Sequence, residues 1–364
     1  MGLKAGIIGL PNSGKTTLFN LLTRAHAAVA PYPFCTIEPN LGVVSVPDSR
    51  LERLAEILKP PRIVPATVEF VDVAGLVKGA SKGEGLGNQF LSAIRGVDAV
   101  VEVIRFFMDP DIPHFMGELD PLRDREVVDI ELMLSDLEIV ERRLQKVQEL
   151  FKKTSSKELE KERDLLLRVR DALSQGIPLR KLTFSEEERV ILKPFQLITL
   201  KPIIYLANLD ESEQARALYQ KMEAWCKQEG APLLPLLVKL EEELQEIEDL
   251  KERTVFMQEF GLEESGLTAF IRETYATLGL ITFYTFGDKE LRAWELLQGS
   301  TAKEAAGKVH TDMQKGFIKA EVINARELLE IGSLEQAKAL GRVRLEGKDY
   351  RVQDGDLLYF HFSV

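Results

Sequence analysis

The sequence predicts an α/β protein in which an open sheet flanked by helices is interrupted by a helical insertion and followed by a small strand-rich module. Three observations support this fold class. An apolar strand leads through a glycine-bracketed loop into a helix within residues 6–22, apolar residues recur at helical spacing over 130–173, and short alternating strands follow residue 279. At 364 residues the chain is long enough for two or three domains.

The first of these stretches, GIIGLPNSGKTT at 6–17, has the spacing of a phosphate-binding loop, G-x-x-x-x-G-K-[ST]. Its glycines allow successive backbone N–H groups to turn toward an anion, and the following helix directs its positive end at the same anion. Lys15 is expected to reach the β- and γ-phosphates, and the Thr16 hydroxyl to bind Mg²⁺. The sequence therefore predicts a nucleotide-binding protein. The loop residues expected to contact the nucleotide are Asn12, Ser13, Gly14, Lys15, Thr16 and Thr17.

The composition is that of an ordinary soluble globular protein, with 45% hydrophobic and 29% charged residues. No stretch approaches the ~20 apolar residues of a membrane span, and the chain enters its first strand without a signal peptide. Cys35 and Cys226 lie far apart in the sequence, which fits a reducing cytoplasm. A net charge of −11 argues against indiscriminate binding to nucleic-acid backbones, so we expect neither a DNA partner nor a membrane partner.

Two loops after the first helix carry residues expected to respond to a γ-phosphate. Thr36 lies in a proline-rich segment before an expected strand at 41–46, where P-loop hydrolases place a threonine that bonds Mg²⁺ and the γ-phosphate. A loop threonine is usually only a turn residue, and its position is what favours the switch role. A strand expected at 66–71 is followed by Asp72 and Gly75, so the carboxylate is expected to hold Mg²⁺ through water and the glycine N–H to meet the γ-phosphate.

The residue after Gly75 is Leu76, whereas Ras-like proteins carry there the glutamine that orients the attacking water. GLPNSGKTT and DVAGLVKGASKGEGLGNQFL resemble the Obg-related branch of P-loop hydrolases, whose members have an apolar residue in place of that glutamine. Later stretches narrow the resemblance to the YchF or Obg-like ATPase family. It covers essentially the whole chain.

A histidine is the candidate to replace the missing glutamine. The buried strand expected at 99–107 leads into a polar loop holding His114, and such a loop faces the ligand crevice of an open α/β sheet. A histidine there is able to orient or deprotonate water. The resemblance implies the same, because the family carries a functional histidine in this loop. The alternative is an ordinary surface histidine. The expected catalytic residues are therefore His114, Lys15 and Gly75.

Residues 129–175 predict an antiparallel helical hairpin, because their apolar positions follow the 3,4 spacing of a coiled-coil seam. The polar break KKTSSK turns the chain, and Gly176 and Pro178 end the second helix. The basic residues of the hairpin either contact RNA or protein or form only a solvated face. The expected seam residues are Ile130, Met133, Leu137, Val140, Leu144, Val147, Phe151, Leu159, Leu166, Val169 and Leu173.

After a strand expected at 198–206, NLDE at 208–211 occupies the place of the guanine-reading motif N-K-x-D. Leu209 replaces the lysine and Glu211 the aspartate, which moves the carboxylate by one methylene and disrupts the pair of bonds to guanine. Loss of such polar recognition costs ~10⁴-fold or more in discrimination. The resemblance implies the same, since N-x-x-E in the YchF-type family accompanies a preference for ATP over GTP, with Asn208 and Leu209 lining the adenine pocket. The alternative reading of NLDE is a helix N-cap.

A helix expected at 213–228 precedes the last strand and loop of the nucleotide domain, expected at 236–240. The family usually has a small S/C-A pair here, but this chain has Leu237 and Val238, followed by Lys239. We expect Val238 and Lys239 to contact the nucleotide. Residues 241–260 are expected to form one acidic helix with a solvated surface.

From residue 279, short strands surround one helix expected at 301–309, and this stretch resembles a TGS domain, a β-grasp module. Basic residues gather there, which suits contact with a ribosome or ribosomal RNA or is plain solvation. These residues are Lys289, Arg292, Lys315, Lys319, Arg342, Arg344, Lys348 and Arg351. The expected divisions are 1–126 and 196–278 for the nucleotide-binding domain, 127–195 for the hairpin and 279–364 for the TGS-like domain.

The sequence thus predicts a cytoplasmic ATPase with Mg²⁺ as cofactor, slow unless stimulated, whose nucleotide state gates binding to ribosomes. Potassium is a second candidate cofactor, because the Asn12 carbonyl oxygen can serve as its ligand and related hydrolases use this position so, although the asparagine is as readily a turn residue. Two alternatives remain: a GTP-binding protein of ordinary specificity, and an RNA- or protein-binding module that nucleotide stabilises and in which hydrolysis is incidental.

Overall fold

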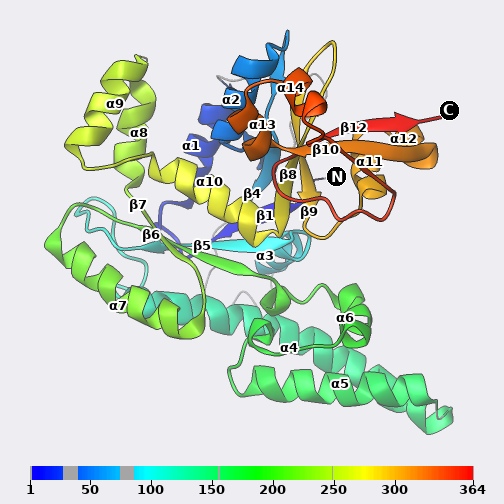
Figure 1. Cartoon of the computed structure of the whole chain (residues 1–364). Coiled ribbons are helices and arrows are strands. Elements are labelled where there is room, and N and C mark those ends of the chain that lie inside the picture. The colour runs from blue at the N-terminus through cyan, green and yellow to red at the C-terminus, as the bar shows by residue number, and fades with distance from the viewer. Residues whose placement is uncertain (1, 28–39, 74–85, 155, 248, 364) are drawn as a thin grey trace. The chain divides into compact units, whose positions relative to one another are not determined.

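The computed structural model describes residues 2–27, 40–73, 86–154, 156–247 and 249–363 (Figure 1). The chain forms two compact units. The first unit contains Leu3–Gly42 and Glu69–Leu267, and the second contains Val43–Val68 and Thr268–Val364. The second unit therefore takes a segment from near the start of the chain in addition to the expected C-terminal module. Among the described helices, none is both long and apolar enough to cross a membrane. The fourfold division predicted above stays a prediction.

The sheet that carries the phosphate loop has the strand order β2-β4-β1-β5-β6-β7. From β4 to β7 neighbouring strands run parallel, so their carboxyl ends share one edge. All residues of β5 and β6 are buried, as expected for strands covered on both faces. The strands are β1 (Lys4–Ile8), β2 (Leu41–Ser45), β4 (Thr67–Asp72), β5 (Ala99–Arg105), β6 (Ile203–Asn208) and β7 (Leu233–Leu236).

Helices cover both faces of this sheet, as the predicted α/β class requires. In Figure 1, α4 and α7 run along one face of β5 and β6, and α1 lies with α8 on the other. The core between the sheet and α3, α4 and α7 contains Ile94, Val128 and Met222, each at most 1% exposed. The helices are α1 (Lys15–Ala27), α3 (Leu86–Arg95), α4 (Pro121–Lys153), α7 (Glu213–Glu229), α8 (Val238–Glu246) and α9 (Leu250–Glu259).

The hairpin consists of α4 and α5 (Lys157–Ser174), and its seam agrees largely with the expected spacing. Met133, Val140, Leu144 and Val147 are buried against Leu166, Val169 and Leu173 in one cluster. Two expectations were wrong. The first helix begins at Pro121 rather than at 129, with the Asp120 side chain capping it through the Arg123 N–H. Ile130 is 44% exposed, because the start of α4 turns Val128 and Leu132 toward the sheet.

Other element boundaries also differ from the expectations. The strand expected at 198–206 begins only at Ile203, because Ile198–Leu200 form a 3-10 helix. The strand and loop expected at 236–240 lie earlier, since β7 ends at Leu236 and Val238 already starts α8. The single acidic helix is two, since Asp249 caps a new helix. NLDE is not the N-cap of α7; Ser212 is, accepting the Ala215 N–H.

The second unit is built on a sheet of order β11-β10-β12-β8-β9-β3. The predicted helix is present as α11 (Ala302–Val309), where Thr301 and Glu304 form a capping box. Its alanines pack on Phe283, Leu358 and other sheet residues. The strands are β3 (Ile63–Val64), β8 (Leu280–Phe286), β9 (Leu291–Leu297), β10 (Phe317–Asn324), β11 (Arg344–Glu346) and β12 (Asp356–Phe362). The expectation of one helix after residue 279 was wrong, because α12 (Thr311–Lys315), α13 (Ala325–Ile331) and α14 (Leu334–Ala339) also form there. The unit further contains α2 (Ser49–Leu58) and most of α10 (Gly266–Thr277).

Candidate nucleotide-binding site

The phosphate loop joins β1 to α1 in a conformation that two of its glycines make possible. Gly9 has φ 147°, and a Cβ on it would lie 2.3 Å from the carbonyl oxygen of Val103. Gly14 has φ 98°, and its Cβ would lie 2.2 Å from Asn208 Nδ2. No other residue type fits these positions without displacing the backbone of β5 or the side chain from β6. Residues of β5 and β6 therefore pack directly against the phosphate loop.

Two asparagine amides hold this loop in place. Asn208, at the end of β6, is 5% exposed, and its Nδ2 donates to the Ser13 carbonyl oxygen at 3.0 Å. Asn12 has φ 63°, and its Nδ2 donates to the Pro113 carbonyl oxygen at 3.1 Å. Asn208 thus links the phosphate loop to the end of β6, and Asn12 links it to the loop that follows β5.

Lys15 lies inside the loop, where its ammonium donates to the Leu10 carbonyl oxygen at 2.8 Å. Burial lowers the pKa of Lys15 to about 8, and the charge of Asp72 opposes the fall. Asp72 ends β4 and pairs in register with Ile7 of β1, which places it beside the start of the loop. Burial raises the pKa of Asp72, and Lys15 counteracts the rise. A cation and a carboxylate that influence each other electrostatically therefore lie at the edge of the sheet where a triphosphate with its metal would bind.

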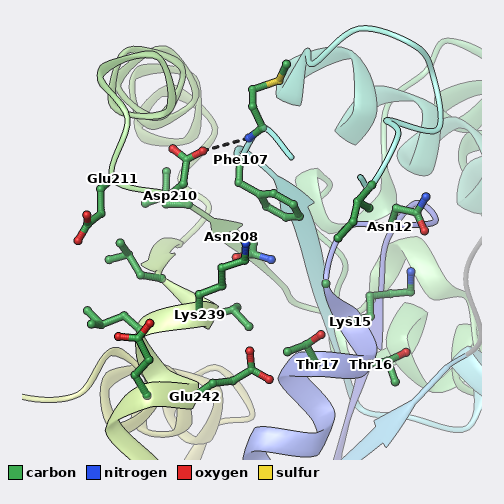
Figure 2. A pocket seen from close by; sticks show the side chains of 18 of the residues that line it. Asn12, Lys15, Thr16, Thr17, Phe107, Asn208, Asp210, Glu211, Lys239 and Glu242 are labelled. Carbon is green, nitrogen blue, oxygen red and sulfur yellow. Dashed lines mark hydrogen bonds between the residues drawn. The ribbon is translucent and has the colours of Figure 1, made fainter. Parts of the chain in front are cut away.

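A cavity of about 750 Å³ opens beside the loop, a size suited to a small-molecule ligand (Figure 2). Lys15, Thr16 and Thr17 lie at one end, and Asp210 and Glu211 lie at the other. Most of the residues predicted to contact nucleotide line this one cavity; Ser13, Asp72 and His114 do not. The predicted residues that line it are Asn12, Gly14, Lys15, Thr16, Thr17, Asn208, Leu209, Glu211, Val238 and Lys239.

Sequence reasoning missed part of the lining. Phe107, Met108 and Ile112 belong to the loop after β5, and the position of that loop at the carboxyl edge of the sheet was a usable signal. Glu242 and Glu243 come from the first turns of α8, which was expected to be strand and loop as far as residue 240. Phe260, at the end of α9, had no signal in the sequence.

Asp210 lies at the end of the cavity away from Lys15, and its carboxylate hydrogen-bonds to the backbone of the chain itself. Its Oδ2 accepts the Met108 N–H at 3.0 Å, drawn as a dashed line in Figure 2, and its Oδ1 accepts the Ser212 N–H at 2.9 Å. Burial works to raise the pKa of Asp210, but hydrogen bonds from Ser212 and Met108 hold it below the ordinary value. Lys239, which also lines the cavity, has its Nζ 3.3 Å from Asp109 Oδ2 in the loop after β5.

His114 does not line the nucleotide cavity. Its ring is 8% exposed, with Nε2 2.7 Å from Asp124 Oδ2 and Nδ1 accepting the Met116 N–H at 3.1 Å. An acceptor at Nδ1 assigns the proton of the neutral ring to Nε2, which donates to the carboxylate. Burial raises the pKa of Asp124, opposed by Arg123 and His114. In this conformation both ring nitrogens are engaged, and the ring borders a separate cavity of about 10 Å³.

Three residues of the predicted switch loops, Thr36, Gly75 and Leu76, lie outside the described residues. Within the part of the chain that the structure describes, no three His, Cys, Asp or Glu side chains converge as a ready-made metal site. Among the described residues, the Thr16 hydroxyl and the Asp72 carboxylate are the groups that would hold a metal at the phosphate loop, together with phosphate oxygens. That donor set is all oxygen, which suits Mg²⁺.

Comparison with known proteins agrees with this geometry. A family model described as 50S ribosome-binding GTPase matches residues 4–132, and one described as YchF-GTPase_C, protein of unknown function, matches 280–363. The chain is 46% identical to the ribosome-binding ATPase YchF of Bacillus subtilis (strain 168) and 48% identical to that of Escherichia coli O157:H7, over 100% of both chains in each case. It is also similar to the solved Schizosaccharomyces pombe YchF GTPase, with TM-score 0.89 and 34% identity over 99% of this chain and 98% of that one. Since this identity extends along the full length, the chain belongs to the YchF family.

Proposed function

We propose that this chain hydrolyses ATP in preference to GTP and that the bound nucleotide controls its association with ribosomes, which implies action in the cytoplasm. The observation that carries the proposal is the cavity itself, where the phosphate loop and the segment 208–211 face one ligand space. The printed names of the bacterial relatives, ribosome-binding ATPase, support both parts.

The phosphate end of the cavity supports triphosphate binding. Gly9 and Gly14 leave the space for an anion against backbone N–H groups, and Lys15 supplies the cation. Bound Mg²⁺, held by Thr16 and Asp72, would neutralise charge on the phosphates. We extend this set to Thr36 and Gly75 on the strength of their sequence positions. Lys15→Ala should abolish tight ATP binding in a folded protein, and an unchanged affinity would mean that the site lies elsewhere.

The base end supports ATP over GTP. Leu209 carries no charge, and Glu211 stands in the place of the guanine-reading aspartate with its carboxylate moved by one methylene, which disrupts the pair of bonds to the guanine N1–H and 2-amino groups. The neighbouring carboxylate of Asp210 does not replace it, because it is committed to Met108 and Ser212. We expect ATP to bind at least about tenfold tighter than GTP, a difference of about 1.4 kcal/mol. Competition of the two nucleotides against a labelled analogue tests this. Equal affinities, or tighter GTP binding, would favour the GTP-binding alternative.

Hydrolysis, in this proposal, depends on His114. Its ring would leave Asp124 and Met116 and place a water against the γ-phosphate, taking the part of the glutamine that Leu76 replaces. Positioned general-base catalysis is typically worth about 10²–10⁴-fold. His114→Ala should therefore lower turnover at least about tenfold and leave ATP affinity within about threefold. Single-turnover hydrolysis measured beside equilibrium binding separates these effects, and wild-type turnover in the variant would remove His114 from the mechanism.

The engaged ring of His114 also favours a second candidate, a nucleotide-stabilised binding module in which hydrolysis is incidental. Ribosomes added to the purified protein distinguish the two functions. A switch should bind ribosomes with an affinity that differs between ATP and ADP, and its turnover should rise on binding. Binding that is the same with either nucleotide, at constant turnover, would favour the module.

The ribosome contact is proposed for the basic residues of the second unit, through ribosomal RNA. Some of these residues are engaged within the unit: Arg292 lies over Trp294, and Arg342 pairs with Glu327. Lys315 and Lys319 are exposed. Charge reversal of these two lysines should weaken cosedimentation with ribosomes, more at low salt than at high salt.

Potassium is proposed as a second cofactor, through the side-chain oxygen of Asn12. The amide nitrogen of this residue donates to Pro113, which leaves its Oδ1 as the atom for a cation. Hydrolysis should then be faster in potassium than in sodium buffers, and Asn12→Ala should erase the difference. Identical rates of the wild-type protein in both buffers would dispose of the idea.

A further inference from the structure

The segment 106–117, here called the β5 loop, joins β5 to the start of α4 and forms part of the nucleotide cavity. It begins beside β6, where the Phe106 N–H donates to the Asn208 carbonyl oxygen at 2.9 Å. Met108 and Ile112 line the cavity, and His114 lies near the far end of the loop. One continuous segment therefore contacts the ligand space and carries the proposed catalytic ring.

Arg105 at the end of β5 donates to the Phe107 and Ile112 carbonyl oxygens of the β5 loop, and three side chains from the nucleotide-binding segments contact the loop as well. Asn12 of the phosphate loop binds the Pro113 carbonyl oxygen through a neutral amide. Lys239 of α8 pairs with Asp109, but its side chain is 81% exposed, so this contact contributes little. Asp210 binds the Met108 N–H with a charged carboxylate at 3.0 Å. Of the three contacts, the one from Asp210 pairs an ionised acceptor with a backbone N–H; the Asp210 side chain is half-buried, and Met108 is exposed.

The place of Asp210 in the chain gives this contact its significance. It lies between Leu209 and Glu211, which both line the base end of the cavity, while its own carboxylate faces the β5 loop. A base that fits against residues 208–211 holds this segment in one position, and the carboxylate of Asp210, to which the Met108 N–H donates, is then held in position as well. A base that fits poorly leaves the position of that carboxylate less well defined.

We propose that Asp210 is a positioning residue for hydrolysis, one that couples the base bound at 208–211 to the placement of the β5 loop. A base that fits thereby raises the rate of hydrolysis in addition to the affinity. The inference rests on the proposed function in one respect: the group that the loop positions is taken to be His114.

Asp210→Asn tests this coupling with little change in shape. The asparagine oxygen keeps the turn to Ser212, whereas its amide nitrogen meets the Met108 N–H as a second donor and breaks that bond. The turnover of ATP should fall about tenfold, with the equilibrium Kd for ATP within about threefold. The turnover of GTP should change less than about twofold, because guanine does not hold residues 208–211 in position. Hydrogen exchange at the Met108 amide should accelerate.

Two further variants separate the mechanism from a structural effect. Ser212→Ala removes the other side-chain partner of Asp210 and the cap of α7 but leaves the Met108 bond, so its turnover should stay within about twofold of wild type. In a His114→Ala background, Asp210→Asn should cause no further loss, because both changes act on one step.

Several results would overturn the proposal. These are unchanged ATP turnover in Asp210→Asn, an equal loss for ATP and GTP, and a rise in Kd that accounts for the whole loss of kcat/KM. Full turnover in His114→Ala alone would contradict the proposed role of the histidine. In that case the ATP-specific loss in Asp210→Asn still decides whether Asp210 positions the loop.

Discussion

Replacing Asp124 by asparagine should raise the basal rate of ATP hydrolysis about fivefold. The Nε2–H of His114 donates to Asp124 Oδ2 at 2.7 Å, and both side chains are at most 8% exposed. A hydrogen bond to a charged group is worth about 1.5–3 kcal/mol, about twice a neutral one, so asparagine weakens this contact by about 1 kcal/mol. Because the proposed mechanism requires the ring to leave the contact, about 1 kcal/mol less for its release is about a fivefold gain in rate.

Phosphate release under single-turnover conditions at saturating ATP measures this gain, and equilibrium titration shows whether affinity has changed. His114→Ala and the double variant are the controls, because the gain should vanish when the ring is absent. A turnover equal to or below wild type would refute the reasoning that Asp124 restrains the ring. A gain that persists without His114 would show that the carboxylate acts by another route.

Three further predictions concern charge and stability. ATP affinity should fall as pH rises above about 8, because burial lowers the pKa of Lys15 to about 8 and only its charged form attracts phosphate. Calorimetry above pH 8 should show proton uptake when ATP binds, and Lys15→Arg should remove the pH dependence. Asp136→Ala should lower the free energy of unfolding by about 3–5 kcal/mol in denaturant titrations, because the fully buried carboxylate pairs with Arg95 and accepts the buried N–H groups of Ile198 and Thr199, which would lose their partner. A loss below about 1 kcal/mol would contradict this. Tyr284→Phe should cost about 1.5–3 kcal/mol in the second unit by removing the hydroxyl that donates to Asp48, and an unchanged Tm would count against it.

Much of the candidate site was predictable because its requirements are local. An anion against backbone N–H groups demands Gly9 and Gly14 within a few residues, so the spacing alone identified the loop. Helical spacing identified the hairpin, since apolar positions three and four apart must share a face. The resemblance of NLDE at 208–211 to a base-reading motif predicted that this segment faces the ligand, and the segment lines the same cavity as the phosphate loop; its contact with the base stays a prediction.

What tertiary structure alone decided depends on contacts between segments far apart in the sequence. The start of α4 at Pro121 escaped prediction because its first turns pack on the sheet rather than on the hairpin. The partner of Asp210 is Met108, about a hundred residues earlier, because β5 and β6 are neighbours in the sheet. The sequence placed His114 on the crevice side of the fold, but rotation of one side chain toward Asp124 determines whether it faces the nucleotide or the interior, and no local pattern encodes that choice.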